Sequence, residues 1–425
     1  MAEKKIIQSV KGTREFYPAE MALRNFIYEK ARKASQLFGF QEWDGPFLET
    51  IELYAAKSGD ELVKEQAFVF PDRGGDLITL RPELTPTLAR MIAQKQNELT
   101  YPLRWWSFGP FWRYERPQRG RSREFFQWNV DMVGVNSPEA DAELIAVAAT
   151  FLRLAGLGPE RSVILVNNRK LMDQKFAELA IPQEDRLAVS NAVDRRGKME
   201  AEKWDTYVLE LGLNQAQLDG LKALLADYDL WKTSDELVRL MNTLKSLGVA
   251  DYVRFDPNIM RGLLYYTGTV FEAFDTTGSV KRAIFGGGRY DNLLKDVGGE
   301  PLSGVGFAMG DVVIGLILKE AGLVAESETA TAKVLVTVFN EECFGEAAKT
   351  AAELRLAGFN TILIPEPAKL QKQFKFADKA GVRFVLVQGP DEISANLVTI
   401  KNLAEATQQQ VQRCELVSTL QALLG

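Results

Sequence analysis

Five arginines lie between Arg113 and Arg123, and a proline and a glycine interrupt the run. An arginine side chain donates hydrogen bonds in pairs from a planar group that keeps its charge, so clustered arginines suit phosphate groups. Directly after the run, apolar and polar residues alternate from Phe126 to Met132, which predicts a strand with polar side chains on one face. The pattern indicates a hairpin with anion-binding donors at its tip. A hairpin whose arginines only face solvent would show the same pattern.

Two further motifs are less specific. Glu83 directly follows a predicted strand and precedes Thr85 by two residues, and it could be no more than the N-terminal signal of a helix. The glycines Gly286–Gly288 follow a strand predicted over Lys281–Phe285. They would let the backbone approach a ligand or another strand closely, or they could form a flexible turn.

The chain contains no histidine and only two cysteines, Cys343 and Cys414. A histidine general base, a histidine metal ligand and a structural zinc site are therefore excluded. A metal would have oxygen ligands here, such as Mg2+ that arrives with a nucleotide. Two cysteines leave no disulfide framework and indicate a reducing compartment, so the expected location is the cytoplasm.

Composition narrows the class of protein. Apolar residues make up 46% of the 425 residues and charged residues 25%, which is typical of a globular chain with several domains. The net charge of −6 gives no overall attraction for nucleic acid, so a polyanion would need a local basic patch. No segment approaches the roughly 18 apolar residues of a membrane span. The N-terminal sequence also lacks the apolar centre of a signal peptide.

Hydrophobic periodicity predicts the elements that must position these residues. In the first part of the chain we expect a helix over Ala19–Phe38, an extended segment over Phe40–Glu49, a hairpin over Ala67–Arg81, a helix over Pro86–Gln96, a strand over Leu103–Phe108 and a helix over Pro138–Leu157. Pro46 lies inside the extended segment and cannot donate to a sheet, so it belongs at a sheet edge or a subunit contact. The segment from about Leu171 to Val249 predicts several short helices, which form an insertion.

Strand patterns resume after the insertion. They are expected over Thr269–Phe274 and Ser303–Met309, followed by a helix over Asp311–Ala321. The polar segment Glu326–Thr331 predicts a linker between domains. Beyond it, alternating elements predict a mainly parallel α/β domain, with strands at Val334–Phe339, Asn360–Ile364, Arg383–Val387 and Leu397–Ile400, and helices at Gly345–Ala357, Leu370–Ala380 and Glu405–Leu424.

From about Gly12 to the C-terminus, the motifs together resemble the histidyl-tRNA synthetases, a family of class II aminoacyl-tRNA synthetases. The most specific match is RGLLYYTGTVFE at Arg261–Glu272. The others are KGTREFYP at Lys11–Pro18, LRPELT at Leu80–Thr85, FWRYERPQRGRSREFFQ at Phe111–Gln127, GGGRYD at Gly286–Asp291 and GVGFAMG at Gly304–Gly310.

The resemblance implies an α+β, multidomain architecture. A catalytic domain over residues 1–325 would hold an antiparallel six-stranded sheet flanked by helices, with the helical insertion at about 171–249. An α/β anticodon-binding domain would follow at 332–425. The resemblance also implies a homodimer that is joined through the segment around Pro46.

The implied reaction is ATP-dependent activation of L-histidine to histidyl-adenylate, followed by transfer to the 3′ end of tRNA(His), with Mg2+ accompanying ATP and no separate metal site in the protein. Arg261 and Arg113 would be catalytic, because they would stabilise charge on the α-phosphate. Histidine would be bound by Glu83, Thr85, Gln127, Asp131, Tyr265 and Tyr266. ATP would be bound by Arg113, Glu115, Phe125 and Arg261. The acceptor end of the tRNA would meet Arg116, Gln118, Arg119, Arg121 and Arg123.

Three positions depart from the family pattern. Asp131 stands where a longer glutamate is common, and Leu264 replaces the aspartate of RGLDYY. Val313 replaces the arginine that usually follows GFAMG and reaches the γ-phosphate. Arg282 and Arg289 are the two residues that could supply the missing charge.

Two alternatives remain at this point. The first is a catalytically inactive, histidine-sensing paralogue such as the regulatory subunit of ATP phosphoribosyltransferase. Such paralogues generally lack the C-terminal domain and tend to lose Arg261 and the arginine hairpin, all of which are expected here. The second is a related enzyme that modifies a protein instead of tRNA. The motifs favour the synthetase over both.

Overall fold

The computed structural model describes residues 6–55, 65–260, 266–278, 280–292, 294–324 and 332–424. These residues form two units, and each has its own sheet and core. The first unit is built from Leu23–Val324 together with the residues up to Phe16, and the second from the residues after Val324 together with Tyr17–Ala22. The predicted linker Glu326–Thr331 lies outside the described residues. Within the described parts of the chain, no helix is both long and apolar enough to cross a bilayer.

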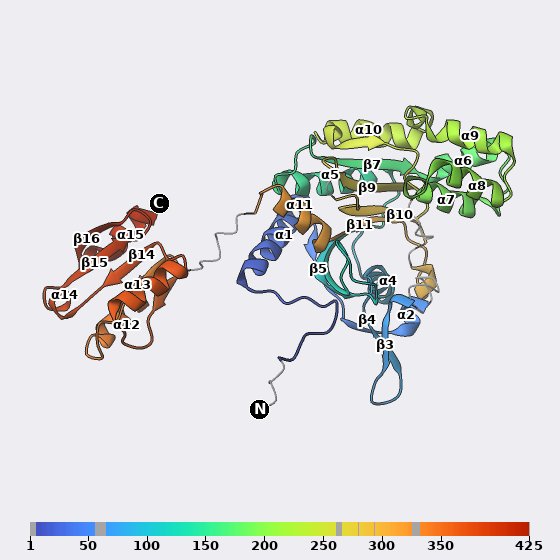
Figure 1. Ribbon diagram of the computed structural model, residues 1–425. Coiled ribbons are helices and arrows are strands. Elements are labelled where there is room, and N and C mark those ends of the chain that lie inside the picture. Colours follow the sequence, from blue (N-terminus) through green and yellow to red (C-terminus); the bar gives the residue numbers. More distant parts are fainter. Residues whose placement is uncertain are drawn as a thin grey trace. The chain divides into compact units, whose positions relative to one another are not determined.

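The first unit is organised around an eight-stranded sheet (Figure 1). In spatial order its strands are β1 (Gln41–Glu42), β5 (Leu103–Trp112), β6 (Glu124–Val133), β11 (Gly304–Gly310), β10 (Phe285–Tyr290), β9 (Thr269–Asp275), β7 (Ser162–Asn168) and β8 (Val253–Phe255). The six strands from β5 to β7 are antiparallel. The expected six-stranded antiparallel sheet is therefore confirmed, with one short parallel strand added at each edge.

The hairpin predicted around the arginines is the pair β5–β6, which is in register over ten residue pairs from Leu103↔Val133 to Trp112↔Glu124. Strand β7 was not predicted, although its sequence SVILVNN is a continuous buried run. Such a run has no alternation to identify it as a strand, because a buried strand in the middle of a sheet is covered on both faces.

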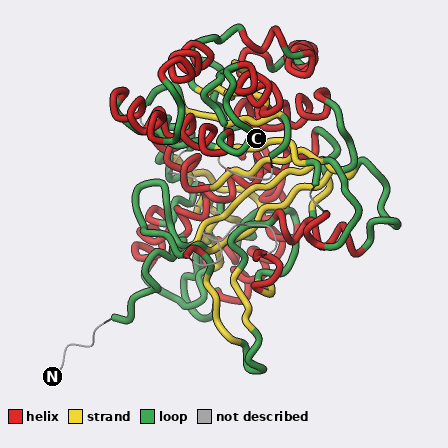
Figure 2. The backbone as a smooth tube through the Cα atoms, turned by 90° about the vertical axis from the view of Figure 1, so that its right-hand side faces the viewer, coloured by secondary structure: helices red, strands yellow, loops and turns green. Residues whose placement is uncertain are grey.

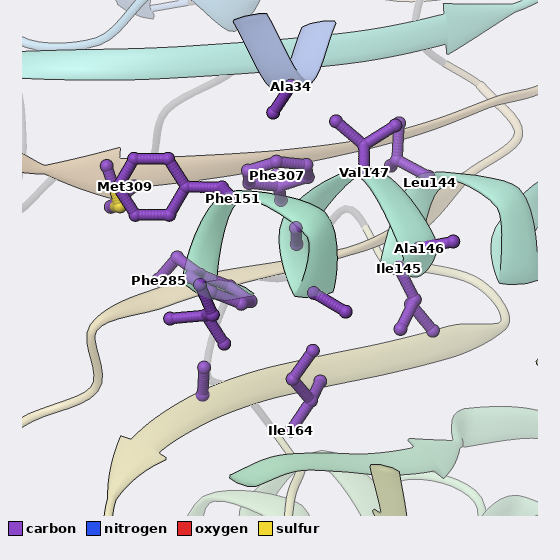
Figure 3. Close-up of a cluster of buried hydrophobic side chains, with 14 of the residues drawn as sticks. Ala34, Leu144, Ile145, Ala146, Val147, Phe151, Ile164, Phe285, Phe307 and Met309 are labelled. Atoms are coloured by element: carbon purple, nitrogen blue, oxygen red, sulfur yellow. The ribbon is translucent and has the colours of Figure 1, made fainter. Parts of the chain in front are cut away.

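Helices cover this sheet and form the main core (Figure 2). They include α1 (Pro18–Leu37), α5 (Pro138–Leu154) and α11 (Asp311–Glu320), which were all predicted to within three residues at each end. The alanines of α5 let the helix lie close to the sheet, and Ser137 caps it by accepting a hydrogen bond from the Ala140 N–H. Figure 3 shows Phe151 of α5 beside Phe307 of β11 and Phe285 of β10.

A three-stranded sheet adjoins the large one, in the order β2 (Leu48–Thr50), β4 (Leu77–Leu80), β3 (Phe68–Pro71). This confirms the hairpin predicted over Ala67–Arg81. The segment around Pro46 is only partly extended, since β1 and β2 occupy its ends and Pro46 lies between them. The short helix α2 (Ile51–Ala55) follows β2, and α4 (Thr85–Gln94) follows β4.

The helical insertion is confirmed. Its helices are α6 (Arg169–Glu178), α7 (Arg186–Arg195), α8 (Ala201–Glu210), α9 (Gln215–Leu225) and α10 (Asp235–Ser246). Four of them, α6 to α9, share a core and gather at one end of the sheet in Figure 1, whereas α10 lies along the sheet and adds Leu240 and Leu244 to the main core. The insertion leaves the sheet at β7 and returns at β8, and these two strands pair in parallel.

The strand predicted over Lys281–Phe285 is wrong by several residues. Strand β10 begins at Phe285 and contains Gly286–Gly288, so the triplet is strand and not turn. A Cβ atom on Gly287 would clash with the carbonyl oxygen of Gly306 on the neighbouring strand. The glycines are needed because β10 lies so close to its neighbours that no space remains for side chains at these positions.

The second unit holds a five-stranded sheet in the order β13 (Thr361–Leu363), β12 (Val334–Val336), β14 (Phe384–Val387), β15 (Leu397–Asn402), β16 (Thr407–Gln412). Its helices are α12 (Phe344–Leu356), α13 (Leu370–Lys379), α14 (Pro390–Ser394) and α15 (Leu416–Leu424). Strands β13, β12 and β14 are parallel, whereas β15 pairs antiparallel with β14 and β16 antiparallel with β15. The α/β character is therefore confirmed, but the parallel part is smaller than expected.

The single helix predicted over Glu405–Leu424 is wrong in its first half. Residues Thr407–Gln412 form β16, an edge strand that pairs with β15, and only Leu416–Leu424 is α-helical. The sequence TQQQVQ is almost entirely exposed. An exposed edge strand needs no apolar alternation, so its local pattern did not reveal it.

Candidate active site

The register of the central strands defines one polar face of the large sheet. Gln127, Asn129 and Asp131 of β6 lie on the same face because they alternate along the strand. Directly opposite them on β11 are residues with little or no side chain: Gly310, Ala308 and Gly306. Strand β10 continues the same face with Gly286 and Gly288. The face is therefore a floor of small residues bordered by polar side chains.

Two side chains pack against these small residues. Asp131 lies against Gly306, where a Cβ atom would clash with its Oδ1 atom. The ring of Tyr290 lies against Gly304, whose Cβ would be 2.5 Å from the tyrosine Cε2. The Tyr290 hydroxyl donates a hydrogen bond to Asp131 Oδ1 at 2.5 Å. The G-x-G spacing in β11 thus seats a tyrosine–aspartate pair, and Tyr290 is a site residue to which the sequence analysis assigned no role.

The carboxyl group of Asp131 has an unusual titration. The residue is 7% exposed, and this burial raises the pKa of Asp131 to about 7, although the hydrogen bond from Tyr290 acts in the opposite direction. The charged form of Asp131 therefore becomes dominant only above neutral pH.

This shift predicts a pH-dependent stability. Since the pKa is raised in the fold, protonated Asp131 stabilises the protein at low pH, and this contribution is lost as the pH rises from about 4 to 7. As the pH rises from about 4 to 7, the midpoint of thermal unfolding of the wild type should therefore fall relative to that of Asp131→Asn, whose amide does not titrate. Above pH 7 the difference between the two proteins should stay constant. Parallel curves for the two proteins between pH 4 and 8 would contradict the shift.

Arg113 lies at the end of β5, beside the segment that carries Glu83. Its Nε donates to the carbonyl oxygen of Pro82 at 2.9 Å, and its guanidinium carbon lies 5.4 Å from the centre of the Phe125 ring. No acidic side chain among the described residues pairs with it. One edge of the guanidinium is thus anchored, and the rest is available to an anion.

Phe125 and Glu83 are placed by their neighbours. The Phe125 ring stacks on the ring of buried Phe111, with centroids 5.9 Å apart. The Glu83 carbonyl accepts a hydrogen bond from the Tyr54 hydroxyl at 3.3 Å. Thr85 is the first residue of α4, but Leu84 is the N-cap and no side chain caps the helix, so the sequence marks the helix start without a capping hydrogen bond. A role in ligand binding for Glu83 and Thr85 stays a prediction.

Arg81 is a positioning residue that the sequence analysis did not identify. It is fully buried, and it donates to Asp44 Oδ1 at 2.6 Å, to the Gly45 carbonyl at 3.1 Å and to the Pro110 carbonyl at 3.0 Å. These bonds join the segment after β1, the end of β5 and the start of the Pro82–Thr85 segment. The LRPELT motif contained this arginine, but only its complete burial separates its role from that of a surface arginine.

Residues 113–123, between the paired ends of β5 and β6, are called the arginine loop below. Arg121 pairs with Glu115 at 3.0 Å, Arg119 pairs with Glu320, and the Arg123 guanidinium lies 4.0 Å from the centre of the Tyr114 ring. Gln118 and Arg121 close the tip through two backbone hydrogen bonds. Arg116 is exposed. The loop therefore has a defined structure, and Glu115 has a cationic neighbour on the protein itself.

Tyr266 is buried against the glycine triplet, and a Cβ atom on Gly288 would be 2.7 Å from its Cδ1 atom. Its carbonyl accepts a hydrogen bond from Arg169 Nη1 at 2.9 Å. Arg261, Leu264 and Tyr265 lie outside the described residues.

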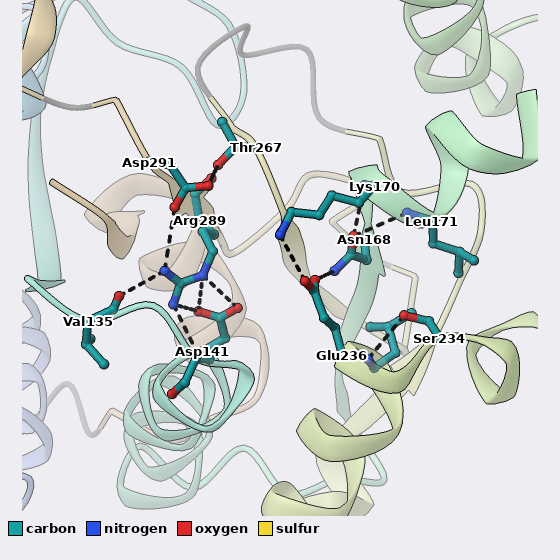
Figure 4. A network of polar contacts seen from close by, with 12 residues as sticks. Val135, Asp141, Asn168, Lys170, Leu171, Ser234, Glu236, Thr267, Arg289 and Asp291 are labelled. Atoms are coloured by element: carbon teal, nitrogen blue, oxygen red, sulfur yellow. Dashed lines mark hydrogen bonds and ion pairs between the residues drawn. The ribbon is translucent and has the colours of Figure 1, made fainter. Parts of the chain in front are cut away.

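Arg289 does not belong to this face. It alternates with Gly288 and Tyr290 along β10 and lies among the core side chains, 3% exposed. Figure 4 shows it paired with Asp141, whose Oδ1 accepts from its Nε at 3.0 Å, and it also donates to the carbonyls of Val135 and Ser137. Because its donors are occupied, Arg289 cannot supply a cation to a ligand on the opposite face.

Comparison with known proteins agrees with the geometry. The family model for histidyl-tRNA synthetase matches residues 12–311, and that for an anticodon binding domain matches residues 333–423. A protein named Histidine--tRNA ligase from Opitutus terrae is 39% identical over 422 residues, covering 96% of each chain. Another of that name, from Leptospira biflexa, is 35% identical over 428 residues, covering 96% of each.

Solved structures give the same result. The crystal structure of histidyl-tRNA synthetase from Nostoc sp. PCC 7120 superposes with a TM-score of 0.86 at 26% identity, covering 99% of this chain and 100% of that one. The family models, the relatives and the solved structure all indicate the same family as the motifs that form the polar face and the arginine loop. The chain belongs to the histidyl-tRNA synthetase family.

Proposed function

We propose that this protein is a histidine–tRNA ligase. In the first step, a carboxylate oxygen of L-histidine attacks the α-phosphorus of ATP, and the bond to pyrophosphate breaks. In the second step, a ribose hydroxyl at the 3′ end of tRNA(His) attacks the carbonyl of histidyl-adenylate, so AMP leaves and the hydroxyl proton is released. The observation that carries the proposal is the polar face floored by glycines. Beside it, near the segment that carries Glu83, lies Arg113, which is anchored at Pro82 and has no acidic partner among the described residues.

The proposed histidine site uses that face. Asp131 and Tyr266 would read the imidazole, with Tyr265 beside them, and Tyr290 would hold the Asp131 carboxyl in place through its hydrogen bond. Glu83, Thr85 and Gln127 would hold the α-amino group. On β6, Gln127 and Asp131 are four residues apart, a distance of about 13 Å. This separation leaves room for one histidine between them, with its α-amino group toward Gln127 and its imidazole toward Asp131.

The proposed ATP site lies at the start of β6. Phe125 would stack on adenine, Glu115 would meet its edge, and Arg113 and Arg261 would stabilise the charge that develops on the α-phosphate. Mg2+, when bound with ATP, neutralises phosphate charge. It would be held by the phosphate oxygens of the bound nucleotide, without a separate metal site in the protein.

We assign the two units to two tasks. Residues 1–325 would carry the chemistry, with the insertion at about 171–249, and residues 332–425 would bind the anticodon. Arg116, Gln118, Arg119, Arg121 and Arg123 would meet the acceptor end of the tRNA. The active form would be a homodimer joined around Pro46, and the reaction would take place in the cytoplasm.

Histidine-dependent ATP–pyrophosphate exchange tests the proposal. Purified protein with Mg2+, ATP and histidine should exchange labelled pyrophosphate into ATP, and the other amino acids should not support the reaction. A histidine-sensing paralogue would bind histidine but show no exchange at any ATP concentration. The second unit and the full-length relatives named Histidine--tRNA ligase argue for the enzyme.

A further inference from the structure

The loop between β9 and β10 brings a cation to the arginine loop. Arg282 is half-buried, and its side chain lies over Gly120 at the tip of the arginine loop. A Cβ atom on Gly120 would be 3.1 Å from Arg282 Cδ and 3.5 Å from its Nε. The same Cβ would be 3.8 Å from Val313 Cγ2, on the first turn of α11. Three segments that are far apart in the sequence therefore converge around Gly120.

The charges at this point are not balanced. Arg121 lies close enough to Arg282 to lower its pKa, after the larger effect of burial, while Glu115 opposes both. Glu115 is already paired with Arg121 at 3.0 Å. Among the described residues, no hydrogen bond or ion pair engages the Arg282 guanidinium. A half-buried guanidinium beside a second cation, with one shared carboxylate, leaves net positive charge that an anion would neutralise.

Arg282 and Val313 are neighbours in space but not in sequence. Val313 presents a short apolar side chain where an arginine is usual in the family, as noted above. Of the two arginines that could replace that charge, Arg289 is held in the core by Asp141. Arg282 and Val313 both lie within 4 Å of a Cβ position on Gly120, and Arg282 is also near Glu115 of the proposed nucleotide site.

We propose that Arg282 binds the terminal phosphates of ATP in this protein and replaces from the β9–β10 loop the cation that α11 lacks. The proposal rests on the proposed function, since it assigns a further residue to the ATP site. It predicts contact with the β,γ end of the nucleotide. Arg113, at the base of the arginine loop, is anchored at Pro82 beside the proposed α-phosphate position, whereas Arg282 lies at Gly120, at the tip of the loop.

The test combines kinetics with direct binding. Arg282→Ala should raise the KM for ATP in pyrophosphate exchange about ten- to hundredfold, as expected for one lost charge-assisted contact, with little change in the KM for histidine. Binding of a non-hydrolysable ATP analogue should weaken by the same factor, whereas AMP binding should not change. Introducing Val313→Arg into Arg282→Ala should restore much of the ATP affinity.

The matched control is Lys281→Ala, which removes a neighbouring exposed cation from the same loop and should leave the KM for ATP unchanged. Circular dichroism confirms that each variant is folded, and Arg282→Gln takes the place of the alanine variant if the latter does not fold. An unchanged ATP affinity in a folded Arg282 variant would overturn this proposal, as would equal weakening of ATP and AMP. A defect only in tRNA charging would reassign Arg282 to tRNA. Absence of exchange in the wild type would instead refute the proposed function.

Discussion

Replacing Arg113 with alanine is expected to lower histidine-dependent pyrophosphate exchange by about 10²- to 10³-fold. The guanidinium is anchored through Nε to the Pro82 carbonyl and has no acidic partner among the described residues. It is therefore preorganised to stabilise charge that develops on the α-phosphate. Because that charge grows toward the transition state, kcat should fall more than the KM for ATP rises.

The fold should tolerate this change. Arg113→Ala removes one side-chain hydrogen bond, worth about 1 kcal/mol, from a half-buried position, so the melting temperature should fall by only a few degrees. Arg73→Ala is the control, since it removes an arginine from the exposed turn between β3 and β4. If exchange falls equally in both variants, or if Arg113→Ala unfolds the protein, Arg113 is not the catalytic cation.

Removal of residues 325–425 should separate the two activities. The first unit keeps its own core without them, and the second unit has a separate core around β12, β14 and α12. Exchange by the truncated protein should remain near the wild-type rate. Aminoacylation of tRNA(His) should fall by about 10²- to 10⁴-fold, because one of two linked binding modules has been lost.

Two controls make this result specific. The isolated second unit, added in trans, should not restore charging, since linkage to the first unit provides the effective concentration. Raising the tRNA concentration should partly restore it, because the catalytic unit remains intact. Normal charging by the truncated protein would show that the second unit does not bind the tRNA.

The sequence alone predicted the elements whose patterns are local. Helix α5 follows from its alanine-rich apolar run after Ser137 and Pro138, and β6 from strict alternation between Phe126 and Met132. The helical insertion follows from the lack of strand formers over about 80 residues. That length accommodates roughly four to six helices of ordinary length. In each case, neighbours along the chain carry the information, because a helix or a half-buried strand places polar and apolar residues at a fixed period.

The motifs also predicted the family and named most of the residues that are proposed for the site. The arginines and the polar side of β6 could be named because charge and hydrogen-bonding groups are visible in the residue types. What they contact could not. The sequence offered Arg282 and Arg289 as equivalent cations, and only the tertiary structure separated them: Asp141, 148 positions away, holds Arg289 in the core.

Tertiary contacts decided the remaining features. Gly286–Gly288 resemble a turn locally, but close pairing of β10 with β9 and β11 makes them strand. The sequence TQQQVQ becomes β16 because β15 offers an open edge. Asp131 and Tyr290 meet because glycines on β11 leave room for both. Each of these depends on which distant segments lie side by side, and that is set by the energy of long-range packing and pairing, which no local pattern encodes.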